Sequence, residues 1–188
     1  MIDSQNSFAE LVERYRPYLR LLARQAIGQR FQGKIEPSDV AQETLAGACK
    51  DWELLRKFNE PELLAGLRTR LQNDVKDAVD YWTRHKRDVG NLQHSAPSVE
   101  QSHAQLVEKI AADQTSPSEK VMREELLVRF AAALEQLSEA QRTAIELRHI
   151  KAWSLKEISR SMGRSESAVA GLLRDGKRKL AAMLNEGE

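Results

Sequence analysis

Apolar residues recur at intervals of three and four positions along most of the chain, and this spacing predicts helices. The first apolar stripe starts at Phe8 and continues to Ala26, and Gly28 marks its end. Ser7 and Glu10 have the spacing of a capping box, so we expect this helix to begin there. Because signals for strands are scarce, the pattern predicts an all-α protein.

A second helix is predicted to start at Pro37, a residue type favoured in the first turn, and to extend to Trp52. Cys49 falls on its apolar face, where we expect a small, buried hydrophobic side chain rather than a nucleophile. A polar edge at helical spacing carries Asp39, Gln42 and Glu43.

A third helix should start near Pro61 and run to about Lys86, with Leu64 and Leu71 among its inward residues. Its outer face is expected to carry Arg68, Asn73, Lys76, Asp77 and Asp80. The helix ends in a basic string, residues 84–87, which favourable interaction with the helix dipole alone can explain.

The pattern then weakens over a stretch rich in Ser, Gln, Pro and Ala, which is typical of a linker. We expect two small helical domains, residues 1–90 and 118–188, joined by a flexible linker at 91–117. Residues 98–112 are apolar enough to form a transient helix within it.

The C-terminal domain has the signals of a helix-turn-helix. Ser138 starts a capping box, and Ser154 with Glu157 makes a second one before a short helix. Gly163 supplies the turn, and Ser165 caps the last helix. A tri-helical module that binds another protein would have the same apolar spacing, so the motif alone leaves both interpretations open.

Composition narrows the functional classes. The 188 residues carry a formal net charge of +1 with 30% charged residues, so any contact with nucleic acid must come from local basic patches. A single cysteine excludes an intramolecular disulfide and a cysteine-based zinc site. Apolar runs are shorter than the roughly 20 residues of a membrane span, and we expect no signal peptide, because the start MIDSQNSFAE lacks its basic and apolar segments. These features predict a soluble, cytoplasmic protein without membrane insertion.

Candidate catalytic groups are sparse. The four histidines have no metal-ligand spacing, and we expect each to be solvated or at a helix end; they are His85, His94, His103 and His149. The polar edge around Asp39 has no second acidic cluster or phosphate-binding loop beside it. The sequence therefore predicts no cofactor, no metal site and no enzyme.

The last helix offers the better candidates. Its outward residues and the turn before it would place polar and basic groups in a DNA major groove, namely Arg164, Ser165, Ser167, Arg174, Lys177 and Arg178. Between these lie Ala170, Gly171 and Asp175, which leave sequence-specific contacts open.

Taken together, the order of these parts resembles a bacterial RNA polymerase sigma factor of the sigma-70 family, extracytoplasmic-function (ECF) group. DVAQETL is similar to the family's polymerase-binding helix, which implies that Asp39, Gln42 and Glu43 face the β′ clamp of core RNA polymerase. An exposed acidic and amide edge on a rigid helix suits pairing with a basic partner helix.

The resemblance extends to the third helix and the loop before it, LRKFNEP, which in the family melt the −10 element and hold a flipped base. It implies −10 DNA contacts from Phe58, Asn59, Asn73, Lys76 and Asp77. Gly66 stands where the family often has Trp, and Arg70 where it has an apolar residue.

The second domain resembles the family's −35-binding domain, which also contacts the polymerase β flap. The resemblance thus implies core polymerase and promoter DNA as partners and leaves an anti-sigma factor open. It predicts an alternative sigma factor that directs promoter-specific initiation. The alternative is a helical adaptor or helix-turn-helix regulator that binds polymerase or DNA without initiating transcription.

Overall fold

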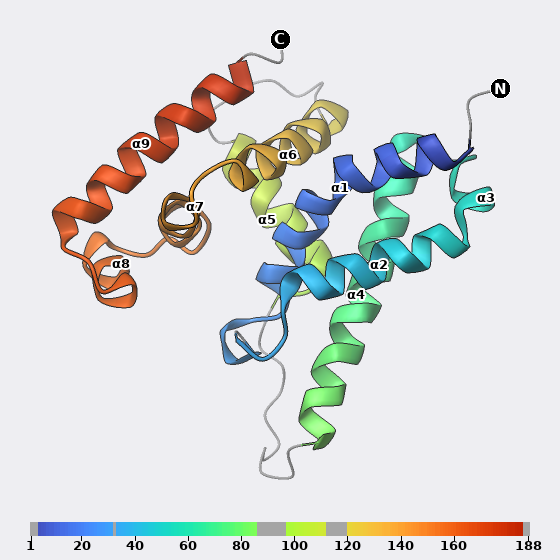
Figure 1. The fold of residues 1–188 in the computed structure, drawn as a ribbon, viewed down its shortest axis with the longest axis horizontal. Coiled ribbons are helices and arrows are strands. Elements are labelled where there is room, and N and C mark those ends of the chain that lie inside the picture. Colours follow the sequence, from blue (N-terminus) through green and yellow to red (C-terminus); the bar gives the residue numbers. More distant parts are fainter. Residues whose placement is uncertain (1–3, 32, 86–96, 112–119, 186–188) are drawn as a thin grey trace. The chain divides into compact units, whose positions relative to one another are not determined.

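The computed structural model describes residues 4–31, 33–85, 97–111 and 120–185. Every regular element in these ranges is a helix (Figure 1), which confirms the all-α prediction. The chain divides into two compact units, Met1–Gln105 and Leu106–Glu188. No helix in the described ranges is both long enough and apolar enough to cross a membrane.

Unit 1 is built on three longer helices, α1 (Ser4–Ala26), α2 (Pro37–Lys50) and α4 (Glu60–His85). A 3-10 turn, η1 (Gln29–Phe31), follows α1, and the short helix α3 (Trp52–Leu55) follows α2. The α4 helix extends well beyond α2 at its C-terminal end (Figure 1). Its predicted bounds were correct within a residue at each end.

The core of unit 1 forms where the apolar stripes of these three helices meet. Leu19 and Leu22 of α1, Ala41 of α2 and Leu71 of α4 are fully buried, each with 0% of its surface exposed. Burial of this kind contributes about 25 cal/mol per Å² of apolar surface, so the stripes that predicted the helices also hold them together.

A further helix, α5 (Val99–Ala111), lies inside the segment predicted as a linker. Its N-terminal half belongs to unit 1, because the division between the units falls after Gln105. The predicted domain limits at residues 90 and 117 both lie outside the described residues, as do His94 and the basic residues 86 and 87.

Unit 2 contains α6 (Lys120–Glu135), α7 (Glu139–Ile145), α8 (Leu155–Met162) and α9 (Glu166–Asn185). A π-helical turn, η2 (Glu146–Ile150), continues α7. Both predicted capping boxes are present: the Ser138 hydroxyl accepts from Gln141 N at 3.3 Å, and the Ser154 hydroxyl accepts from Glu157 N at 3.3 Å. Each box satisfies backbone N–H groups that a helix start leaves unpaired.

Three predicted side-chain environments are wrong. Cys49 is exposed, because it comes one position after buried Ala48 at the end of α2. Arg68 is only 7% exposed, although it was expected on the outer face of α4. His103 is 9% exposed rather than solvated, because α5 presses it against unit 1.

Two predicted helix limits also need correction. The α1 helix begins at Ser4, so Ser7 lies inside the helix and is not its N-cap. Trp52 starts α3 and is not the end of α2, since the backbone turns at Asp51.

Candidate nucleic-acid interface

The turn between α8 and α9 is fixed by local backbone chemistry. Gly163 ends α8 with φ 61° and ψ 34°, the left-handed conformation that glycine adopts without steric cost. Arg164 N donates to Ser159 O at 3.0 Å, and Ala168 N donates to the Ser165 hydroxyl at 3.2 Å. Ser165 therefore caps α9, as the sequence predicted, and the turn sets where α9 begins.

The inward face of α9 is set by four buried residues at helical spacing, Val169, Leu173, Gly176 and Leu180. Gly176 allows the close approach of α7, since a Cβ placed there would lie 3.2 Å from Ile145 Cγ1. Once this face is buried, the register of a regular helix turns the other face to solvent.

All six candidate residues of the turn and of α9 are exposed: Arg164, Ser165, Ser167, Arg174, Lys177 and Arg178. Asp175 lies beside two of them, with its Oδ1 3.5 Å from Arg178 Nη2 and 3.9 Å from Arg174 Nε. These ion pairs are exposed and therefore weak, but they place a negative charge among the cations. The acidic residue thus offsets part of the positive charge of this face.

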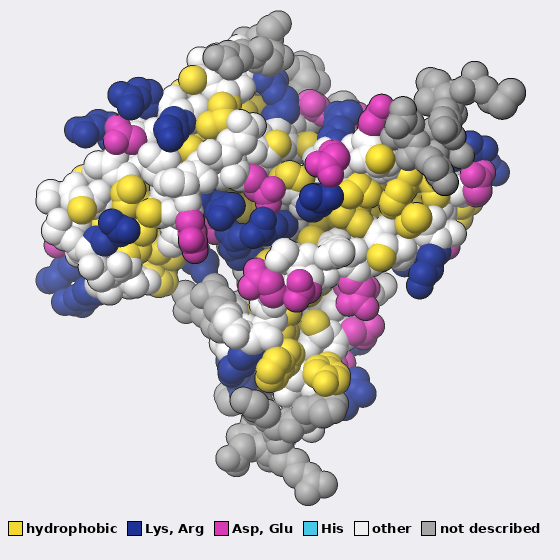
Figure 2. All heavy atoms as spheres, in the orientation of Figure 1, with side chains coloured by type: hydrophobic (Ala, Val, Ile, Leu, Met, Phe, Trp, Pro, Cys, Tyr) yellow, Lys and Arg dark blue, Asp and Glu magenta, His cyan; other side chains and the backbone are white. Residues whose placement is uncertain are grey.

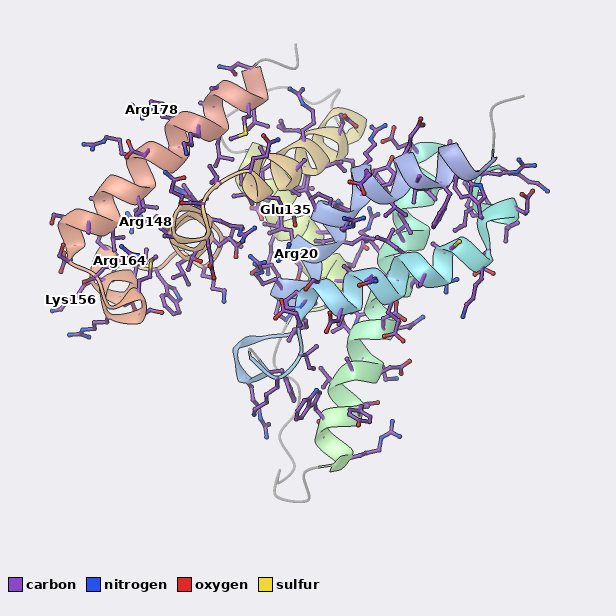
Figure 3. All side chains as sticks on the ribbon, in the orientation of Figure 1. Arg20, Glu135, Arg148, Lys156, Arg164 and Arg178 are labelled. Atoms are coloured by element: carbon purple, nitrogen blue, oxygen red, sulfur yellow. The ribbon has the colours of Figure 1, made fainter. Side chains whose placement is uncertain are left out.

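Two exposed basic residues outside the predicted set belong to the same unit. Lys156 of α8 and Arg148 of η2 are exposed, and Figure 3 shows Lys156 and Arg164 near the end of the unit where α8 leads into α9. Arg148 Nη1 also donates to Trp153 O at 2.9 Å, which ties the side chain to the loop before α8. Their position in LRHIKAWSLK, next to the helix-turn-helix, was the sequence signal for them.

The polar edge of α2 forms a second surface, on unit 1. Asp39, Gln42 and Glu43 are all exposed, while the buried face of the helix includes Val40 and Leu45. Figure 2 shows acidic side chains along this part of the molecule. The three polar side chains follow one another at helical spacing, so a partner helix can meet all of them at once.

The α4 helix presents a third group of candidates. Asn73, Lys76 and Asp77 are exposed and occupy adjacent turns of one face. Phe58 precedes the helix and is 41% exposed, which is unusual for a large apolar side chain. The amide of Asn59 has a structural role, because its Oδ1 accepts from Glu62 N at 3.0 Å and caps α4.

The departures at Gly66 and Arg70 fit the packing of α2 against α4. The Arg70 side chain passes over Gly47, where an added Cβ would overlap the guanidinium, and forms an ion pair with Asp51. A Cβ added at Gly66 would have no neighbouring atom within 4 Å, so an alanine there would meet no obstacle. Arg70 thus joins two helices where an apolar contact would otherwise do so.

These surfaces can be compared with known families. Residues 127–180, from α6 into α9, match the family described as Sigma-70, region 4. The C-terminal unit carries a sigma-70 region 4 domain. No curated protein matches the chain.

The region 4 match supports a place for the chain in the sigma-70 family and indicates DNA binding and promoter recognition. It also supports RNA polymerase and promoter DNA as partners. Region 4 is a family of DNA-binding regulatory domains and not a family of enzymes. Within the region 4 domain, the basic face of α9 and its turn is the surface suited to phosphates and base edges.

Proposed function

We propose that the protein is an alternative sigma factor of the ECF type, which binds core RNA polymerase and directs promoter-specific initiation. The observation that carries the proposal is the region 4 domain at 127–180 in a chain whose other unit presents the exposed polar edge of α2. A sigma factor needs both a DNA-binding surface and a polymerase-binding surface, and the two units offer one candidate each.

In this proposal Asp39, Gln42 and Glu43 contact the β′ clamp, and unit 2 contacts the β flap. Exposed carboxylates attract a basic partner helix and guide its approach, whereas the amide adds a directional hydrogen bond. Weak DNA contacts then suffice, because a tethered unit binds its site at high effective concentration.

The −10 element would be opened at α4 and at the loop before it. The exposed ring of Phe58 offers a stacking surface for an unpaired base, and the amide of Asn73 can hydrogen-bond to a base edge. Lys76 adds a cation for the backbone phosphates. Asn59 contributes through the loop, since its own side chain caps α4.

The −35 element would be contacted by α9, with Arg164, Lys177 and Arg178 close to phosphates and Ser167 and Arg174 closer to base edges. Sequence discrimination by so few side chains would be modest, because each good bidentate contact contributes about 1–3 kcal/mol. The surrounding basic residues supply affinity without discrimination.

The test is transcription in vitro with sigma-free core polymerase from the protein's own host and fragmented host DNA, followed by mapping of RNA 5′ ends. New start sites that share two upstream elements are expected. Asn73→Ala should abolish opening at these sites while polymerase binding persists, and Asn185→Ala at the exposed end of α9 should change neither.

An adaptor that binds polymerase without initiating transcription is the second candidate. It is favoured by the extent of the family match, which covers residues of unit 2 alone. Stable polymerase binding without any new start site would select the adaptor. Absence of polymerase binding would exclude both candidates.

A further inference from the structure

The N-terminal half of α5 belongs to unit 1, and its own sequence defines where the helix begins. Ser98 and Gln101 form reciprocal hydrogen bonds, with Ser98 N donating to Gln101 Oε1 at 2.9 Å and Gln101 N donating to Ser98 Oγ at 3.1 Å. This capping box fixes the first turn of α5. Val99, directly after the cap, is only 1% exposed.

Polar contacts join this first turn to α4. Val99 N donates to Gln72 Oε1 at 2.7 Å, so a side chain of α4 satisfies one of the open N–H groups of α5. Arg68 Nε donates to Glu100 Oε2 at 3.0 Å. Two residues of α4, one turn apart, therefore hold the start of α5.

The Arg68 side chain continues the connection into α1. Its Nη1 donates to the Tyr18 hydroxyl at 3.3 Å, and Tyr18 is 1% exposed. Burial lowers the pKa of Arg68, but Tyr18 and Glu100 outweigh it and raise the pKa above its usual value. Arg68 thus stays charged inside unit 1 while Glu100 reaches it from α5.

The next turn of α5 packs against the same part of unit 1, beside Tyr18. His103 meets the Tyr18 ring edge to face, with 6.3 Å between ring centroids and an interplanar angle of 86°. Its Nδ1 lies 4.0 Å from Glu100 Oε1. We call this cluster the α5 anchor. It consists of Tyr18, Arg68, Gln72, Val99, Glu100 and His103.

The anchor shortens the chain available between the DNA-binding surfaces. As a random coil, residues 98–105 alone would span on the order of 15 Å, and this length becomes available to the tether if α5 is released. One base pair of B-DNA advances about 3.4 Å along the helix axis, so that reach corresponds to roughly four or five base pairs. A fixed α5 removes this freedom.

We propose that the α5 anchor limits the separation of the two units and thereby sets which spacer lengths between the −10 and −35 elements the protein accepts. The promoter part of this inference rests on the proposed sigma function. Arg68, Gln72 and Glu100 act here as positioning residues, since none of them has to touch DNA.

The first experiment measures the separation without DNA or polymerase. Spin labels are attached to Cys49, the single and exposed cysteine, and to Ser161→Cys at the exposed end of α8. Glu100→Lys should lengthen and broaden the distance distribution by on the order of 15 Å, because like charges at Arg68 release α5. Glu108→Lys makes the same charge change at an exposed position of the same helix and should leave the distribution unchanged.

Val99→Asp is a second way to release α5 while the core of α1, α2 and α4 stays intact. An unchanged distribution in both Glu100→Lys and Val99→Asp would overturn the anchor, whatever the outcome of transcription. Circular dichroism of each variant shows whether the chain as a whole has kept its helix content.

The second experiment measures transcript yield from a mapped promoter whose spacer is changed by one, two and three base pairs. The unaltered protein and Glu108→Lys should lose about tenfold at a change of two base pairs, whereas Glu100→Lys should lose about threefold or less. Equal profiles for all three proteins would show that polymerase alone sets the spacing and would overturn the spacer proposal. Absence of transcription by the unaltered protein would instead reject the proposed function, and the label distances would still decide on the anchor.

Discussion

The long-range polar contacts of unit 1 and the capping boxes of unit 2 differ in reach. In unit 1 the Thr44 hydroxyl donates to Asp74 Oδ2 at 2.6 Å across 30 positions of sequence, and Arg68 reaches Tyr18 across 50. The capping boxes of unit 2, at Ser138 and Ser154, join residues three positions apart. Contacts of the first kind depend on the assembled fold, whereas those of the second kind form with the helix itself.

The difference has an energetic consequence. Thr44 has 0% exposed surface, and without Asp74 its hydroxyl would be left to the Val40 carbonyl one turn back in α2, while the Asp74 carboxylate would lose this donor. The capping groups Ser154 and Glu157 are exposed, and water can replace part of what they provide. The long-range contacts of unit 1 should therefore be more sensitive to single polar substitutions than the capping boxes of unit 2.

The sharpest test of this comparison replaces two arginines of α4. Arg68→Ala should lower the free energy of unfolding of unit 1 by about 3 kcal/mol, because it removes a buried side chain and leaves the Tyr18 hydroxyl without this donor. Arg70→Ala removes a partly exposed ion pair with Asp51 and should cost about 0.5 kcal/mol. Urea unfolding followed by tryptophan fluorescence, in a Trp153→Phe background, reports on unit 1; equal losses would contradict the contrast.

A second test concerns packing in unit 2, where two glycines of α9 differ in their surroundings. Gly176→Val should destabilise unit 2 by about 2 kcal/mol, since the added atoms meet Ile145 and Gln141. Gly171→Ala should instead stabilise it by roughly 0.5–1 kcal/mol, because a Cβ there meets no atom within 4 Å and alanine favours helix. Thermal unfolding measures both, and a stable Gly176→Val protein would show that α7 and α9 can separate without loss.

Local sequence signals account for the helices that the sequence predicted correctly. The apolar stripes and caps predicted α4, α8 and α9 nearly to the residue, because period and capping are properties of neighbouring residues. The same reasoning placed Arg68 outside and His103 in solvent. Both errors arose from α5, whose docking on α1 and α4 joins residues far apart in sequence.

In the candidate nucleic-acid interface, too, the sequence predicted which residues face solvent but not which side chains pair. The exposure of Ser167 and Arg174 followed from the helical period of α9, once Val169 and Leu173 were assigned to the core. The ion pairs of Asp175 and the contact of Arg148 with the loop carbonyl of Trp153 depend on side-chain positions. Periodicity predicts which face of a helix is exposed, but it does not predict which partners the exposed side chains contact.

A third test asks how much Asp175 weakens the basic face. Asp175→Asn should raise affinity for duplex DNA about threefold at low salt, because it removes a negative charge beside Arg174 and Arg178. The slope of log affinity against log salt should steepen by up to about 0.9 if one more phosphate contact forms. Glu139→Gln, at the exposed start of α7, serves as the control; an identical response of both variants would mean that net charge alone matters.

The smallest expected effect separates the two capping boxes of unit 2 by pH. Hydrogen bonds from the Ser154 side chain and backbone lower the pKa of Glu157 below its usual 4.5. A lowered pKa means that the box stabilises α8 fully above the unfolded value and loses this contribution as pH falls through the folded pKa. Thermal midpoints of unit 2, measured from pH 7 to pH 3, should therefore fall less steeply in Glu157→Gln, which keeps the hydrogen-bonding geometry but cannot titrate.

The box at Ser138 already has Gln141 in the same position, so it provides the internal comparison for this experiment. Gln141→Glu should introduce there the acid sensitivity that Glu157→Gln removes from α8. If the two exchanges leave the fall of the thermal midpoint at low pH unchanged, the loss of stability in acid originates elsewhere in the chain. If they move it in opposite directions, ionisation at this position of the two boxes accounts for the pH response, with a contribution at the Ser138 box from Lys179, whose Nζ donates to Gln141 Oε1 at 3.4 Å.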